Sequence, residues 1–199
     1  MGLGKALGLD RYTERQYFGE RLQILSGVFQ NLAVELEISS GEWHPYLRIT
    51  VEFPRALAQD LKVFSEERSG LIGNVRNLHE FEIGEEEFDD RFVLFAHERE
   101  RLELMLPEST RYQMLRIIED ADELRLTDNA LFLFVDHPCE RVETKTMFKK
   151  AIELGQRLYK TARLLGPRTP EKGAGHYEQA TIEQAIRTSS VSEAEESSG

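Results

Sequence analysis

Hydrophobic and polar residues alternate along the first third of the chain. In residues 32–39 apolar and polar side chains take turns at successive positions, and residues 46–53 repeat the pattern. A period of two is typical of a β-strand with one face on the core and the other in water. Residues 22–29 are expected to pair with residues 32–39 across a turn at Gln30–Asn31, because asparagine tolerates the left-handed conformation that such turns need.

Further strands are predicted downstream. A short edge strand is expected at residues 60–65 and another strand at residues 78–83. Residues 92–95 and 131–135 are apolar at consecutive positions, so both faces of these two strands should be covered. Residues 123–127 are expected to form a hairpin with the second of them.

Helical spacing of apolar residues begins after residue 98. Residues 99–121 are predicted to be helical with a break at Pro107, which suits the first turn of a second helix. Residues 142–165 carry apolar side chains at helical spacing over the longest stretch of the chain. Gly166–Pro167 is a typical helix stop.

These elements predict an α+β fold with a mainly antiparallel sheet, two or three helices packed on one face and a long C-terminal helix. Residues 1–21 are interpreted as an N-terminal arm and residues 22–166 as the single domain. Residues 167–199 are rich in serine and acidic residues and are expected to be a largely disordered tail. Within that tail, residues 176–187 have the spacing of a short helix.

Composition narrows the classes of function. The 199 residues carry a formal net charge of -11, which argues against a nucleic-acid-binding protein because phosphate repels an acidic surface. Cys139 is the only cysteine, so no intrachain disulfide is possible. The sequence shows neither an apolar stretch long enough to cross a bilayer nor a signal peptide, which predicts a cytoplasmic protein.

An acidic and aromatic run at residues 84–95 stands out from the amphipathic pattern. Gly84 precedes three glutamates, and Phe88, Asp89 and Phe92 follow. We interpret it as a structural motif in which the two phenylalanines anchor an acidic turn and glycine supplies a backbone angle closed to other residues. The carboxylates are also a candidate cation site, although the ligand spacing of a calcium loop is absent.

The sequence offers little catalytic chemistry. His137 and Cys139 are the one place where two ligand or nucleophile types meet, and a zinc site needs three or four ligands. Neither a phosphate-binding loop nor a dinucleotide fingerprint is present. We therefore predict a protein without a metal, a cofactor or catalytic residues.

Basic side chains follow one side of the predicted C-terminal helix in this acidic chain. Such a stripe suits an acidic protein, an anionic lipid surface or nucleic acid, although a solvated helix face has the same pattern. Glu143 and Glu153 lie within the same stretch and weaken the nucleic-acid interpretation. The stripe consists of Lys145, Lys149, Lys160 and Arg163, with Lys150 and Arg157 nearby.

The two strands expected at residues 92–95 and 131–135, here called the late strands, have apolar side chains on both faces. If helices pack on one face, then Val93, Phe95, Phe132 and Phe134 need cover on the other. The N-terminal arm, a second copy of the chain, a ligand or other parts of the same fold are the alternatives, of which cover within the chain is favoured.

Residues 22–165 resemble a loose group of uncharacterised bacterial proteins that share a domain of unknown function. The resemblance rests on Gly84, the Phe88–Asp89 step with Phe92, and the strand, helix pair and hairpin that follow. It implies a fold and brings no catalytic residues with it.

Two functional hypotheses follow. The first is a non-catalytic protein-binding or scaffold module that binds a protein partner or associates with itself. Its contacts would come from the basic stripe, the late strands and a tail segment that acts as a tethered ligand through Tyr177, Ile182 and Ile186. Peripheral contact with a membrane is a weaker expectation.

The alternative hypothesis is a small-molecule-binding protein or an enzyme. It predicts a pocket between the sheet and the long helix with a few convergent polar groups, for which His97, Tyr112 and His137 are candidates. A filled interface under the helix would favour the binding module, and a lined cavity would favour the alternative.

Overall fold

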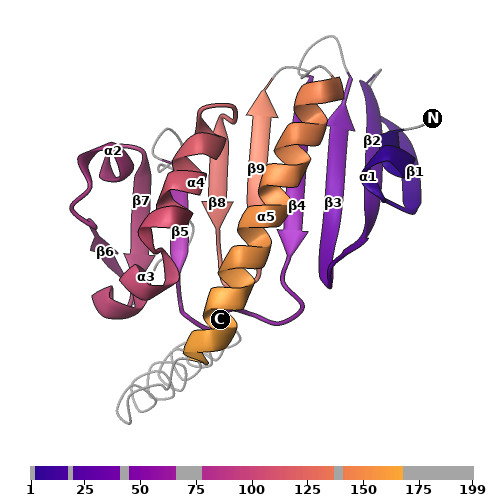
Figure 1. Cartoon of the computed structure of the whole chain (residues 1–199). Coiled ribbons are helices and arrows are strands. Elements are labelled where there is room, and N and C mark those ends of the chain that lie inside the picture. Colours follow the sequence, from indigo (N-terminus) through magenta and orange to yellow (C-terminus); the bar gives the residue numbers. More distant parts are fainter. Residues whose placement is uncertain (1–2, 18–19, 41–44, 66–77, 137–140, 168–199) are drawn as a thin grey trace, which may run out of the picture. The chain divides into compact units, whose positions relative to one another are not determined.

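The chain folds around one antiparallel β-sheet. The computed structural model describes residues 3–17, 20–40, 45–65, 78–136 and 141–167, and Met1–Pro167 form one compact unit. The described strands are β1 (Arg11–Tyr17), β2 (Glu20–Phe29), β3 (Leu32–Ser39), β4 (Tyr46–Glu52), β5 (Lys62–Ser65), β6 (His79–Phe81), β7 (Phe92–Ala96), β8 (Glu123–Leu126) and β9 (Ala130–Asp136). These nine lie in the order β1-β2-β3-β4-β9-β8-β5-β7-β6, and each neighbouring pair is antiparallel (Figure 1).

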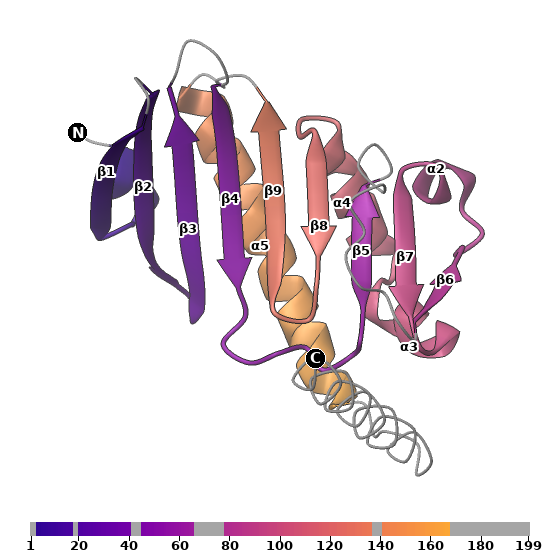
Figure 2. The ribbon, with the colours of Figure 1, turned by 180° about the vertical axis from the view of Figure 1, so that it is seen from behind.

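The longer helices lie on one face of the sheet, and Figure 2 shows the opposite face without them. The described helices are α1 (Leu3–Leu7), α2 (Glu86–Asp89), α3 (Arg99–Met105), α4 (Glu108–Ile118) and α5 (Arg141–Leu165). The α+β class, the antiparallel sheet and the long C-terminal helix are thus confirmed. The expected number of two or three helices is wrong for the described residues, because α1 and α2 are too short to show a helical period.

The two hairpins predicted from the sequence are present. β2 and β3 pair from Phe29↔Leu32 outwards, and the turn residues Gln30 and Asn31 have φ values of 49° and 70°. Both values lie in the left-handed region that tight hairpin turns use. β8 and β9 pair in the same way, starting at Leu126↔Leu131.

The sheet begins earlier than the predicted domain start at residue 22. β1 pairs with β2 over its whole length, from Arg11↔Ser26 to Tyr17↔Glu20, so part of the predicted arm is an edge strand. Residues 11–16 are all exposed. An edge strand with polar side chains on both faces has no hydrophobic alternation from which it could be recognised.

The predicted edge strand at residues 60–65 is an interior strand. β5 pairs with β8 on one side and with β7 on the other, while β6 forms that edge of the sheet. Lys62 and Ser65 gave the segment the polarity of an edge. Its position depends on strands that come later in the sequence, which no local pattern reveals.

Helix α5 packs directly on the sheet at Gly155. A Cβ atom built on Gly155 would lie 2.9 Å from Cγ1 of Val51 in β4, so only glycine allows this approach. The neighbouring Leu154 and Leu158 are both 0% exposed. The interface between α5 and the sheet is therefore filled by side chains.

The aromatic residues on the face of the sheet opposite α5 pack against one another. Tyr46 stacks on Phe134 with ring centroids 5.6 Å apart, and Phe64 meets Phe95 edge-on at 6.3 Å. The guanidinium of Arg125 lies 5.8 Å from the centre of the Phe64 ring. Phe95 is only 7% exposed. These contacts supply cover for the late strands from within the chain.

Candidate functional site

The four residues of the predicted basic stripe are all exposed on α5, but they do not act as one surface. Lys145 and Lys149 lie in the N-terminal half, where Nζ of Lys149 is 3.9 Å from Oε1 of Glu153. Lys160 and Arg163 lie near the C-terminal end and line a pocket. Nearby, Lys150 donates hydrogen bonds to the Arg116 carbonyl at 3.1 Å and to Asp120 at 2.5 Å, which gives it a structural role.

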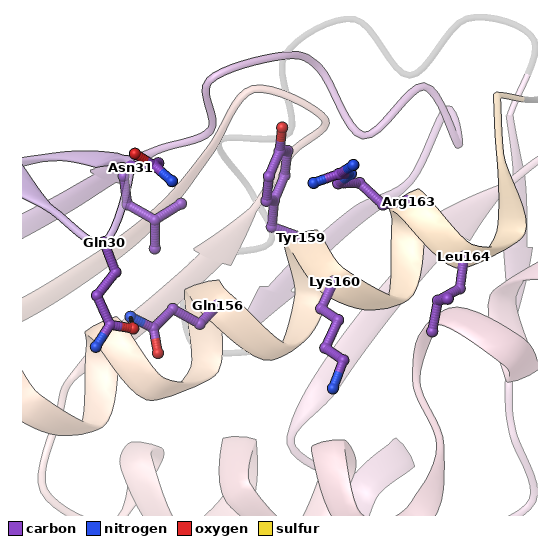
Figure 3. Close-up of a pocket in the computed structure, with 8 residues that line it drawn as sticks. Gln30, Asn31, Gln156, Tyr159, Lys160, Arg163 and Leu164 are labelled. Carbon is purple, nitrogen blue, oxygen red and sulfur yellow. Dashed lines mark hydrogen bonds between the residues drawn. The ribbon is translucent and has the colours of Figure 1, made fainter.

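The pocket lies between α5 and the turn that joins β2 to β3. Its volume is about 370 Å³, and in Figure 3 the side chains of Tyr159 and Arg163 stand beside each other with Asn31 facing them from the turn. The amide of Gln156 donates a hydrogen bond to Gln30, which joins the helix to the turn. The pocket is lined by Gln30, Asn31, Leu32, Gln156, Tyr159, Lys160, Arg163 and Leu164.

A second hollow of about 570 Å³ adjoins the first. It shares Tyr159 and Arg163 with the first pocket and is completed by the loop after β4 and by the end of α5. The residues of this second set are Arg55, Ala56, Leu57, Ala58, Tyr159, Ala162, Arg163, Gly166 and Pro167. We call the two hollows together the α5 groove.

The centre of the α5 groove is held in place by packing. The Tyr159 ring stacks on Phe53 with centroids 6.2 Å apart and planes 7° from parallel. The carbonyl of Gly166 accepts hydrogen bonds from Nε2 of Gln59 at 3.0 Å and from Arg101 at 2.7 Å. These bonds fix the C-terminal end of α5 to the loop before β5 and to α3.

The groove is cationic. Arg55, Lys160 and Arg163 line it, and no acidic residue does. Among the described residues none of these three side chains makes an ion pair or a hydrogen bond. Leu164 adds an apolar side chain that is 80% exposed. An anionic group with an apolar neighbour therefore fits the chemistry of this surface.

The acidic turn before β7 has structural contacts. Gly84 has φ +93°, and the Asp89 carboxylate accepts hydrogen bonds from the backbone N–H groups of Ile83 at 2.9 Å and Gly84 at 2.7 Å. Phe88 is 0% exposed and lies 4.8 Å, between ring centroids, from Phe92. The motif recognised in the sequence thus fastens the turn to the core.

Glu85 connects this turn to α4. Its carboxylate accepts a hydrogen bond from Nε of Arg111 at 2.8 Å, and the Arg111 side chain is 11% exposed. The hydrogen bond from Arg111 holds the pKa of Glu85 below its ordinary value of 4.5. Stability from this pair is therefore fully present above the pKa of the unfolded chain and is lost as the pH falls through the folded-state pKa.

Glu85→Gln should weaken the acid dependence of stability. The wild type is expected to lose more free energy of unfolding than the variant when the pH falls from about 6 to about 3, because glutamine has no proton to gain. Urea unfolding at several pH values measures the difference. Glu87→Gln, an exposed change in the same turn, serves as control, and equal slopes for wild type and Glu85→Gln would contradict the prediction.

The other candidate residues do not converge. Nε2 of His97 lies 3.7 Å from Asp60, and Tyr112 on α4 is 64% exposed; neither lines the groove. In the described part of the chain no three histidine, cysteine or carboxylate side chains are placed to hold a metal ion. His137, Cys139 and the tail residues Tyr177, Ile182 and Ile186 lie outside the described residues.

Sequence reasoning missed part of the groove. Tyr159 lies among the apolar positions of the helix predicted at residues 142–165, and Arg55, Gln30 and Asn31 carried no site signal. These residues come from three segments that only the fold brings together. Lys160 and Arg163 were found because they lie on one helix.

Comparisons with known proteins support the fold. No family model matches the chain, and no curated protein matches it significantly, so the resemblance to uncharacterised bacterial proteins stays a prediction. A solved structure, that of the mycobacterial trehalose monomycolate transport factor A, is similar with a TM-score of 0.52 and 12% sequence identity. The match covers 84% of this chain and 94% of that one, which shows a shared arrangement of elements.

Over the stretches that the structure describes, none of the helices combines the length and the apolar character needed to cross a bilayer.

Proposed function

We propose that this domain is a non-catalytic binding module that contacts a protein partner through the α5 groove. The observation that carries the proposal is the grouping of Arg55, Lys160 and Arg163, without ionic partners among the described residues, on a chain of net charge -11. A local field of opposite sign to the rest of the protein selects anionic partners and guides their approach.

The packing under α5 supports a surface contact over an internal ligand. The alternative hypothesis requires a cavity between the sheet and the helix, but Leu154 and Leu158 are fully buried there and Gly155 touches Val51. The two hollows lie instead along the flank and the end of the helix.

The structural comparison adds one named protein with a similar fold. The similar solved protein is named as a transport factor for trehalose monomycolate. We propose that this chain acts as a cytoplasmic scaffold protein, and that it belongs with the uncharacterised bacterial proteins that its acidic-aromatic motif resembles.

Copurification from the native host with charge-reversal variants tests the proposal. The tagged wild type and Arg157→Glu should retain the same partner, because Arg157 is exposed on α5 but lines neither hollow. Lys160→Glu/Arg163→Glu should recover it at least about tenfold less well, since each lost charge contact at an interface costs on the order of 1 kcal/mol or more. Equal recovery by all three proteins, or no partner with any of them, would contradict the proposal that the domain binds a protein through the α5 groove.

A further inference from the structure

The shape of the α5 groove carries information about its occupant. Two hollows of about 370 and 570 Å³ meet at Tyr159 and Arg163, so the depression extends from the β2–β3 turn to the loop after β4. An elongated depression of this kind accommodates a stretch of extended chain. In Figure 3 Gln30 and Asn31 come from the turn, and the other labelled side chains of the first hollow come from α5.

The chemistry of the lining matches an extended acidic peptide. Lys160 and Arg163 offer charge to carboxylates, and the amide of Asn31 and the hydroxyl of Tyr159 have no hydrogen-bond partner among the described residues. Amides and hydroxyls of this kind satisfy the backbone of a bound peptide. The exposed Leu164 provides contact for one apolar side chain.

Charge and curvature together favour a peptide over a membrane. The groove is concave, whereas a bilayer surface is flat and cannot enter it. The net charge of -11 repels any anionic partner within about 8 Å at physiological salt, and an extended anionic bilayer brings many more charges into that range than one short peptide does. A single acidic strand placed within the groove meets the cationic side chains at contact distance.

From these observations, and resting on the proposed function, we infer that the partner binds the α5 groove through an acidic, extended peptide segment that carries an apolar anchor. Arg55 and Arg163 form the cationic sides of the second hollow and Lys160 extends the charge into the first. The segment's carboxylates lie on these cations and its apolar residue lies on Leu164.

Fluorescence anisotropy with the full chain tests the inference. The probe is a labelled eight-residue peptide of glutamates with two leucines, and its matched control has glutamine at every glutamate. The acidic peptide is expected to bind at least about tenfold more tightly than the glutamine peptide, and the preference should fall as salt rises from about 0.05 M to about 0.5 M. Equal affinities, or no binding of the acidic peptide at millimolar protein, would overturn the inference.

Variants locate the binding. Arg55→Glu/Arg163→Glu should lower the affinity for the acidic peptide at least about tenfold. Lys145→Glu/Arg157→Glu makes the same change of charge elsewhere on the protein and should change that affinity less than about twofold. Circular dichroism melting confirms that each variant is folded. Equal losses in both variants would show a non-specific charge effect and would contradict a groove site.

Two further arms separate other anionic ligands. Inorganic phosphate should fail to displace the peptide, and vesicles containing phosphatidylglycerol should not sediment with the protein. Displacement by phosphate would show that the groove is a simple anion site, and groove-dependent vesicle binding would show that it binds a lipid surface. Either result would overturn the inference of a peptide segment. A partner that copurifies through the groove while acidic peptides fail would leave the binding module intact and refute only this chemistry.

Discussion

Replacing Gly155 by leucine is expected to lower the free energy of unfolding by about 3 kcal/mol, because it inserts a side chain where α5 touches the sheet. The first added carbon alone would lie 2.9 Å from Val51 Cγ1, closer than side chains pack. The higher helix propensity of leucine offsets only about 0.8 kcal/mol of this loss in the free energy of unfolding. The helix must therefore move away from β4, and the α5 groove would widen with it.

Urea unfolding measures this loss. Arg157→Leu is the matched control, since it places the same side chain on the exposed side of the same helix and should change stability by less than about 0.5 kcal/mol. If Gly155→Leu unfolds at the wild-type midpoint, the close approach of α5 to the sheet is not as described.

Phe88→Ala should be similarly damaging, at about 3–5 kcal/mol. The Phe88 ring is 0% exposed and lies against Phe92, so its removal opens a cavity and releases the acidic turn from the core. The polar contacts of Asp89 and Glu85 cannot compensate, because they position the turn without burying apolar surface.

Thermal and urea unfolding should both report the loss at Phe88. Tyr112→Ala removes an aromatic ring that is 64% exposed on α4 and should cost less than about 1 kcal/mol. Comparable losses at the two positions would show that the acidic-aromatic turn is not anchored through Phe88.

Local sequence patterns predicted the strands, helix and turn whose formation depends on neighbouring residues. The alternation in residues 32–39 and 46–53 indicated β3 and β4, and the helical period after residue 141 indicated α5. The turn at Gln30–Asn31 followed from the conformational tolerance of asparagine. Each of these signals comes from residues that lie close together in the sequence.

Features that depend on distant segments were not visible. β5 has the polarity of an edge strand yet lies between β7 and β8, because the strands that flank it come later in the sequence. The same limit applies to the groove. Lys160 and Arg163 were recognised on their helix, but Arg55 joins them only through the loop that follows β4.

The comparison with the transport factor also separates the fold from the surface chemistry. At 12% identity the two chains share few residues, yet the shared fold spans 84% of this one. Buried positions tolerate exchange among apolar residues of suitable volume, so a fold persists while surface chemistry diverges. The cations of the α5 groove therefore have to be tested on this protein itself.

Site-specific photo-crosslinking in the native host tests the central claim most directly. A benzophenone amino acid placed at Leu164, which is 80% exposed, lies in the α5 groove without removing a cation, and the same group at Tyr112 lies on an exposed part of α4 outside it. Irradiation is predicted to give one discrete adduct from position 164 and none from position 112. The same adducts from both positions, or no adduct from position 164, would contradict a partner-binding surface beside α5.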